Sequence, residues 1–132
     1  MPEKTNAQKL LIKSGNRLRF INPPDDLKQW LGDLPDGIKI LDDSDNPALY
    51  PLDAIILFAN NRAELETFLP DLRGMITPDS KMWVAYHKGT SQIKTDINRD
   101  SINAYAQTLG MEGIAIVSMN NDWSALRLKM VG

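Results

Sequence analysis

The residues best suited to chemistry stand together in the stretch from His87 to Thr90. His87 is the only histidine of the chain and the side chain that titrates closest to neutral pH. Lys88, Gly89 and Thr90 supply a cation, a flexible backbone and a hydroxyl, which together suit a phosphate or a carboxylate. A turn that ends a strand, with a solvated Lys88, is the alternative, and it is the one we favour. A general base needs a positioned partner. No acid stands at a spacing from His87 that indicates a catalytic pair, so we predict no catalytic residue.

Four further polar residues follow predicted strands and are candidate ligand-binding residues: Asn22, Asp42, Asn60 and Asn61. In open α/β sheets, ligands bind beyond the carboxyl ends of the strands, near the point where the strand order reverses. We therefore predict that these residues and residues 87–90 form a site for an anionic small molecule. Asp42 stands where an acid at the end of a second strand would hold a ribose, although a loop or capping role is the favoured alternative.

Several catalytic and metal-binding arrangements are excluded by composition. The chain has no cysteine and one histidine, which excludes thiolate zinc sites, iron–sulfur clusters, cysteine nucleophiles and multi-histidine metal sites. It contains neither the Gly-x4-Gly-Lys-Ser/Thr pattern of P-loop nucleotide hydrolases nor the Gly-x-Ser-x-Gly pattern of α/β hydrolases. We therefore predict no metal site and no nucleotide hydrolysis of the P-loop kind.

Hydrophobic periodicity predicts alternating strands and helices that position these residues. Strands are predicted at residues 17–21, 38–41, 53–59, 81–86, 113–119 and 124–130. Helical apolar stripes occur at residues 27–34 and 65–72, and a third helix is predicted at residues 98–109. Asp25 or Asp26 is expected to cap the first helix. Asn60 or Asn61 is expected to cap the second helix, and Asn61, with Glu64 three residues later, resembles a capping box. Pro70 is expected to kink or divide this helix.

This order of elements predicts an α/β fold. Alternating strands and helices imply a mostly parallel sheet covered on both sides, and hence a single three-layer α/β/α domain. The last two strands fit an antiparallel C-terminal hairpin. The domain is predicted to span residues 17–132, after a basic arm or short helix at residues 1–16. If the strand order is 2-1-3-4-6-5, it reverses between the strands that end at Ile21 and Ala59.

Length and charge limit the partners. The chain has 132 residues, a net charge of −2 and a pI near 5.3, so we predict one domain and no general affinity for nucleic acid. Residues 1–20 hold five basic residues against one acidic residue, which a solvated, frayed end explains most simply. No apolar stretch has the length of a signal segment or a membrane span, so the cytoplasm is the expected location. An exposed sheet edge makes a homodimer or another protein partner an open alternative.

Stretches in the second half of the chain resemble the C-terminal half of class I S-adenosylmethionine-dependent methyltransferases. Residues 53–57 and 65–75 resemble the fourth strand of that family and the helix after it, and residues 79–84 resemble the approach to its fifth strand. The terminal hairpin resembles its antiparallel seventh strand beside the sixth. The resemblance implies a Rossmann-like fold that lacks one strand–helix unit, because the chain passes from a second strand directly to the equivalent of the fourth.

Pro23 and Pro24 occupy the place where a methyltransferase has a glycine-rich loop. In that loop, glycine permits positive φ and close approach of the backbone to the cofactor. Two prolines fix φ and remove two N–H donors. We therefore predict no cofactor, S-adenosylmethionine included.

The whole chain is also similar to a family of small bacterial proteins described as a domain of unknown function. The similarity rests on residues 22–24, 83–88 and 123–127, and it implies a fold rather than an activity. The prediction is a small α/β domain, non-catalytic, that binds a protein partner or a small ligand. The alternative is a degenerate methyltransferase, or another transferase that acts on a nucleotide or a phosphorylated small molecule.

Overall fold

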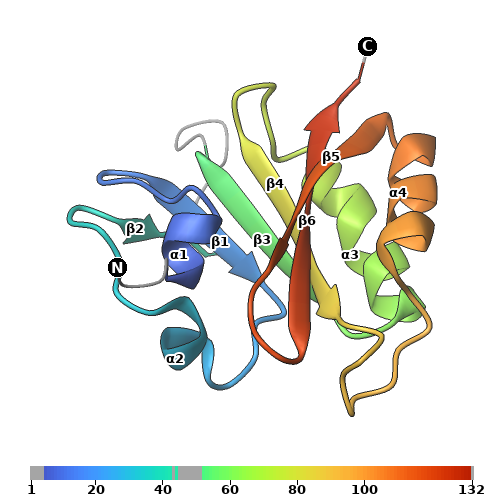
Figure 1. The fold of residues 1–132 in the computed structure, drawn as a ribbon. Coiled ribbons are helices and arrows are strands. Elements are labelled where there is room, and N and C mark those ends of the chain that lie inside the picture. Colours follow the sequence, from blue (N-terminus) through green and yellow to red (C-terminus); the bar gives the residue numbers. More distant parts are fainter. Residues whose placement is uncertain (1–4, 43, 45–51, 132) are drawn as a thin grey trace.

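Six strands form one sheet in the order β2-β1-β3-β4-β6-β5 (Figure 1). The computed structural model describes residues 5–42, 44 and 52–131. The strands are β1 (Arg17–Ile21), β2 (Lys39–Ile40), β3 (Ala54–Ala59), β4 (Lys81–His87), β5 (Met111–Ser118) and β6 (Trp123–Met130). The strand order is the one on which the predicted switch point depends. The predicted pairing is confirmed: β2, β1, β3 and β4 are parallel, and β6 runs antiparallel to both β4 and β5. No described residue between β2 and β3 lies in a strand or helix, so the predicted lack of one strand–helix unit also holds for the described chain.

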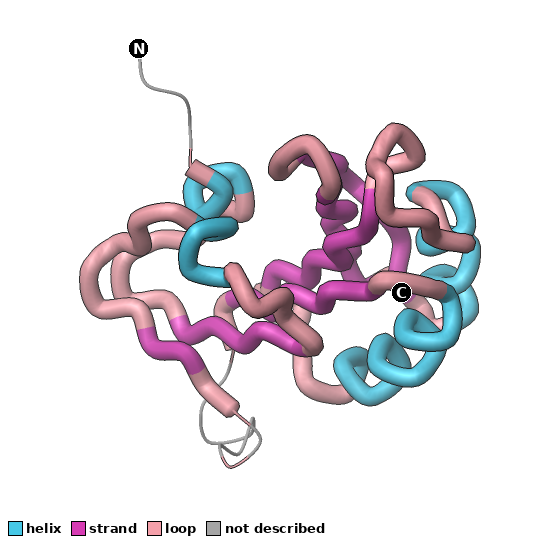
Figure 2. Tube along the Cα trace, turned by 90° about the horizontal axis from the view of Figure 1, so that it is seen from below, coloured by secondary structure: helices cyan, strands magenta, loops and turns pink. Residues whose placement is uncertain are grey.

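Helices cover both faces of the sheet, as the tube in Figure 2 shows. They are α1 (Asn6–Lys9), α2 (Leu27–Leu31), α3 (Arg62–Arg73) and α4 (Arg99–Thr108). Ala7 in α1 and Leu10 just after it are fully buried, so the solvated, frayed end expected here is wrong for the described residues of the N-terminal segment, which contribute to the core. Within the described ranges, no helix is long and apolar enough to cross a membrane.

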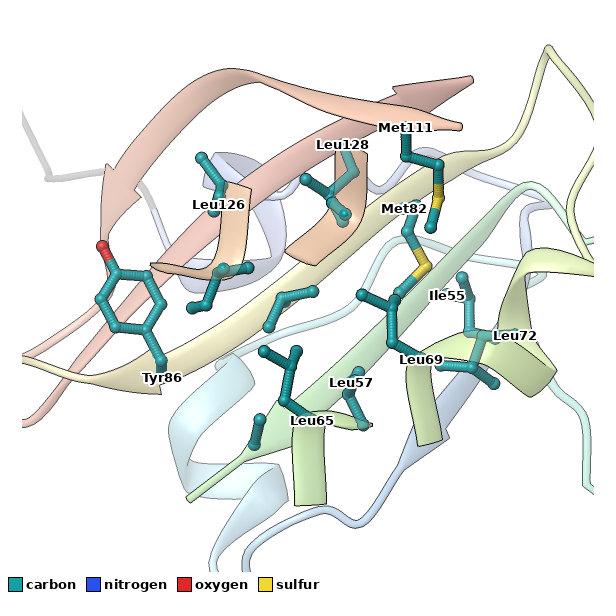
Figure 3. Packing of buried hydrophobic residues seen from close by; sticks show 14 of the residues in the cluster. Ile55, Leu57, Leu65, Leu69, Leu72, Met82, Tyr86, Met111, Leu126 and Leu128 are labelled. Atoms are coloured by element: carbon teal, nitrogen blue, oxygen red, sulfur yellow. The ribbon is translucent and has the colours of Figure 1, made fainter. Parts of the chain in front are cut away.

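The strict alternation of side chains along β3 creates two hydrophobic cores. Ile55 and Leu57 pack on the face covered by α3 and α4, whereas Ile56 and Phe58 pack on the face covered by α1 and α2. Figure 3 shows the first of these cores, in which the α3 residue Leu69 lies against the sheet. Because all six residues of β3 are buried, the continuous apolar run of this strand is explained by its two covered faces.

Two helices depart from the sequence prediction. The helix predicted at residues 27–34 ends at Leu31, because Gly32 adopts a φ of 75° and turns the chain away, and the Asp26 side chain forms no capping bond. The division expected at Pro70 is wrong, since α3 runs through it from Arg62 to Arg73. Its buried leucine stripe against the sheet offsets the hydrogen bond that proline removes.

The C-terminal hairpin is longer than predicted and carries an irregularity in its edge strand. β5 begins at Met111, two residues before the predicted start. Its pairing with β6 shifts register between Gly113 and Ala115, which leaves Ile114 as an extra residue. As a result, Ile114, Ala115 and Ile116 are exposed in succession instead of alternating between faces.

Candidate functional site

A chain of hydrogen bonds joins the carboxyl ends of β1, β3 and β4. Glu64, in the first turn of α3, lies at its centre. Its Oε1 accepts from Nδ2 of Asn22 at 3.0 Å and from both the backbone N and Nδ2 of Asn60 at 2.8 Å. Oδ1 of Asn60 lies 2.7 Å from Nε2 of His87. This network of Asn22, Asn60, Glu64 and His87 includes the point between β1 and β3 at which the strand order reverses.

The side-chain amide of Asn60 determines which nitrogen of His87 carries the hydrogen. Because Nδ2 of Asn60 donates to Glu64, its Oδ1 is the atom that faces His87, and it can only accept. Nε2 of His87 is therefore the donor. Nδ1 is buried and has no hydrogen-bond partner among the described residues.

His87 is the last residue of β4 and belongs to the protein interior. It is 3% exposed, and its ring centroid lies 4.0 Å from that of Trp123 with the planes 35° apart. Burial lowers the pKa of His87, and the nearby carboxylates of Asp122 and Glu64 oppose this shift only in part. Burial therefore favours the neutral form of the ring, which is packed against Trp123.

Asn22 and Asn61 shape the backbone where β1 and β3 end. Asn22 has a φ of 59°, a left-handed conformation that asparagine tolerates better than most residues, and its Nδ2 also donates to the Phe58 carbonyl at 2.9 Å. Asn61 is the N-cap of α3, as predicted, because its Oδ1 accepts from the backbone N of Glu64 at 2.9 Å. In a capping box, the Glu64 carboxylate would accept from the backbone N of Asn61. Here it accepts from the backbone N of Asn60 instead.

Lys88, Gly89 and Thr90 lie in a turn. The turn is closed by a hydrogen bond of 3.0 Å from the backbone N of Ser91 to the Lys88 carbonyl, and Gly89 and Thr90 are exposed. Nζ of Lys88 donates to Oγ of Ser118 at the end of β5, which ties the turn to the hairpin.

Four of the eight predicted site residues line clefts, and they divide between two. Asn22 and Asp42 line a cleft of about 490 Å³ between the β1 edge and α3. Lys88 and Gly89 line another cleft, of about 350 Å³, beside α4. The two clefts share no lining residue. The structure therefore does not bring Asp42 and Lys88 into one site.

Asp42 itself has local hydrogen bonds. One of its carboxylate oxygens accepts from the backbone N and the Oγ of Ser44, at 2.8 and 2.6 Å. Bonds of this kind are typical of a loop, and they fit the loop role that the sequence favours for Asp42.

Two further groups of the Lys88 cleft were missed by sequence reasoning. Tyr86 is 5% exposed, and burial raises the pKa of its phenol, which Arg99 and a hydrogen bond with Ser124 oppose. Arg99 is the first residue of α4, its side chain is 60% exposed, and it pairs with the adjacent Asp100 at 3.4 Å. One signal in the sequence could have identified Arg99, namely its position at the start of the helix that follows His87. In an α/β fold, the start of such a helix lies at the same edge of the sheet as the end of the preceding strand.

No protein-family model and no curated protein matches the sequence. Comparison with solved structures finds similarity across nearly the whole chain. A SAM-dependent methyltransferase from Aquifex aeolicus has a TM-score of 0.60 at 12% identity, covering 96% of this chain and 90% of that one. A TehB-like SAM-dependent methyltransferase from Corynebacterium glutamicum has a TM-score of 0.58 at 9% identity, covering 97% and 89%. A DhpI–SAH complex has a TM-score of 0.58 at 9% identity, covering 96% and 80%.

These similarities establish a methyltransferase-like Rossmann fold for the chain. The fold implied by the sequence resemblance is thereby confirmed. Fold alone does not transfer activity, because function resides in the site that a fold carries.

Proposed function

We propose that this chain is a non-catalytic methyltransferase-like domain that binds a small anionic ligand or a protein partner. The observation that carries the proposal is the network of Asn22, Asn60, Glu64 and His87, in which the polar groups at the switch point bond one another. In a dinucleotide- or nucleoside-binding Rossmann domain, the equivalent edge offers polar groups to the ligand.

The network engages several of the polar atoms that a ligand at this edge could use. Oε1 of Glu64 already accepts three bonds, and both heteroatoms of the Asn60 amide are engaged. A ribose hydroxyl that bound to one of these engaged atoms would have to displace a contact of the network. Each displaced bond leaves a donor or acceptor unsatisfied at a cost of about 1–3 kcal/mol.

The loop after β1 supports the same proposal. Pro23 and Pro24 follow Asn22 directly, and neither carries an N–H that could hold a cofactor carboxylate or hydroxyl. A glycine-rich turn would supply such donors and permit the close approach that nucleoside binding needs.

One observation favours the alternative, a degenerate methyltransferase. Asn22 at the end of β1 and Asp42 just after β2 line the same cleft of about 490 Å³. A ribose held by an acid at the end of the second strand would lie in this part of a Rossmann domain.

Titration with S-adenosylmethionine and S-adenosylhomocysteine, followed by amide NMR, tests the proposal. We expect no saturable shifts at Asn22, Asp42 or Asn60 at millimolar ligand. Saturable shifts at these residues in the wild type, weakened about tenfold in Asp42→Asn, would overturn the proposal in favour of the degenerate methyltransferase. The matched control is Asp79→Asn, which removes the charge of an exposed acid just before β4, outside the cleft that Asp42 lines.

A further inference from the structure

Two clefts adjoin along the surface between α4 and the C-terminal hairpin. One, of about 350 Å³, is lined by Tyr86, Lys88, Asn98, Ser124 and neighbouring residues. The other, of about 210 Å³, is lined by Asn103, the β5 residues 113–116, Leu126 and neighbouring residues. Arg99, Asp100 and Ile116 line both clefts, so we treat them as one feature, the α4–hairpin groove.

The end of the groove near β4 is cationic and rich in donors. Lys88 and Arg99 bring two positive charges, and the hydroxyls of Tyr86 and Ser124 belong to the same lining. Figure 3 shows the Tyr86 oxygen at the end of the apolar core, pointing away from Leu57 and Leu65. Asp100 is the single acid in this lining.

The acidic residue offsets little of that charge for a bound anion. The side chain of Asp100 is 86% exposed, and its contact with Arg99 is a long surface pair between adjacent residues. Pairs of this kind contribute about 0–1 kcal/mol. Arg99 can therefore turn to an incoming anion at little cost.

The other end of the groove is apolar and is shaped by the bulge in β5. Ile114 and Ile116 are each 43% exposed there, although both stand on a strand of the sheet. Gly113 lies beside Leu126, whose Cδ1 would be only 3.0 Å from a Cβ at position 113. The backbone N of Gly113 donates to Oδ1 of Asn103 at 2.8 Å, which fixes the bulged strand against α4.

We propose that the α4–hairpin groove binds a small anion that carries an apolar chain, with its carboxylate or phosphate between Lys88 and Arg99 and its chain along Ile114 and Ile116. This rests on the proposed function, of which it names the ligand class. The two ends of the groove match the two halves of such a ligand in charge and polarity, and the cleft of about 350 Å³ at the cationic end has by itself the size of a small-molecule site.

Octyl phosphate, used below its micelle concentration, is the probe. Inorganic phosphate tests the head group alone, octanol tests the chain alone, and octanoate tests whether a carboxylate replaces the phosphate. We expect calorimetry to show binding of octyl phosphate at least tenfold tighter than that of inorganic phosphate or octanol, with NMR shifts at residues 86–88, 99–100 and 113–116.

Substitutions of two exposed residues test the cationic and the apolar end of the groove separately. Arg99→Gln should weaken octyl phosphate about tenfold without affecting octanol, and Ile116→Ser should weaken it about threefold without affecting inorganic phosphate. Arg62→Gln is the matched charge control because Arg62 is the first residue of α3, as Arg99 is of α4. Ile93→Ser is the matched apolar control, since Ile93 is 48% exposed outside the groove.

Three results would overturn the inference. The first is no binding of octyl phosphate or octanoate, and the second is equal weakening of octyl phosphate binding by Arg62→Gln and Arg99→Gln. The third is a dimer in sedimentation that Ile116→Ser dissociates and octyl phosphate does not. The last would make the groove an interface between two copies of this chain. Saturable binding of S-adenosylmethionine at Asn22 and Asp42 would refute the non-catalytic function, and the octyl phosphate result would still decide the groove separately.

Discussion

Nε2 of His87 donates to Oδ1 of Asn60 across 2.7 Å, linking the carboxyl end of β4 to that of β3. The histidine comes 27 residues after the asparagine in the chain, and parallel pairing of the two strands brings them together. Through the amide of Asn60, this bond continues to Glu64 and then to Asn22. The polar edge of the sheet is thus held by side chains that could otherwise have faced a ligand.

Glu64→Ala should destabilise the protein by about 1–3 kcal/mol, because it leaves the donors of Asn22 and Asn60 without their common acceptor. Urea unfolding followed by circular dichroism measures the change. Glu66→Ala, two residues on in the same helix, removes only an exposed contact with Arg62 and should alter stability by less than about 0.5 kcal/mol. Equal effects of the two substitutions would contradict the role of Glu64 as the centre of the network.

His87 should make the protein less stable in mild acid. Its pKa in the folded state is lowered by burial below the value of 6.5 that applies to the unfolded chain. As the pH falls through about 6.5, the histidine of the unfolded chain binds a proton and that of the folded protein does not. The free energy of unfolding therefore decreases. The decrease ends once the pH is below the folded pKa.

Because His87 is the only histidine, this pH dependence can be assigned to it. Urea unfolding at several pH values between about 7.5 and 5.5 measures the slope. His87→Gln keeps an amide donor for Asn60 but does not titrate in this range, and it should lose the slope. A slope retained in the variant, or a folded pKa above that of the unfolded chain by NMR, would show that burial is not the dominant effect.

Two substitutions of Asn22 should separate the contribution of its backbone conformation to stability from that of its side chain. Both Asn22→Ala and Asn22→Gly remove the bonds to Phe58 and Glu64, but only glycine adopts a φ of 59° without strain. Alanine should therefore be less stable than glycine by about 1 kcal/mol in thermal or urea unfolding. Equal stabilities would mean that the turn after β1 relaxes when the asparagine is lost.

Gly113→Ala should destabilise the hairpin by about 1–3 kcal/mol. The new Cβ would lie 3.0 Å from Cδ1 of Leu126 and 3.4 Å from Oδ1 of Asn103, so the packing of α4 on the bulged strand must shift. Gly89→Ala is the matched control, because a Cβ there would meet nothing within 4 Å. Unfolding free energies of the two variants within about 0.5 kcal/mol of each other would show that Leu126 moves aside freely.

The sequence by itself determined the kinds of elements and their order along the chain. The apolar run at residues 53–59 predicts a strand covered on both faces, and β3 is such a strand. The cap at Asn61 and the antiparallel hairpin also follow from local patterns, because capping and tight connections depend on residues close in the chain. These elements and right-handed crossovers are compatible with the strand order of the structure.

The partners of the polar side chains were decided only by the tertiary structure. In sequence, Glu64 resembles an ordinary capping residue. In the structure, it accepts a hydrogen bond from Asn22, which lies 42 residues earlier in the chain. The groove joins Tyr86 and Lys88 to Arg99 and Ile116 only because β6 pairs with both β4 and β5 and α4 packs against the hairpin. Periodicity records which face of an element is buried, but the distances between side chains on different elements depend on strand register and helix packing, which no local pattern encodes.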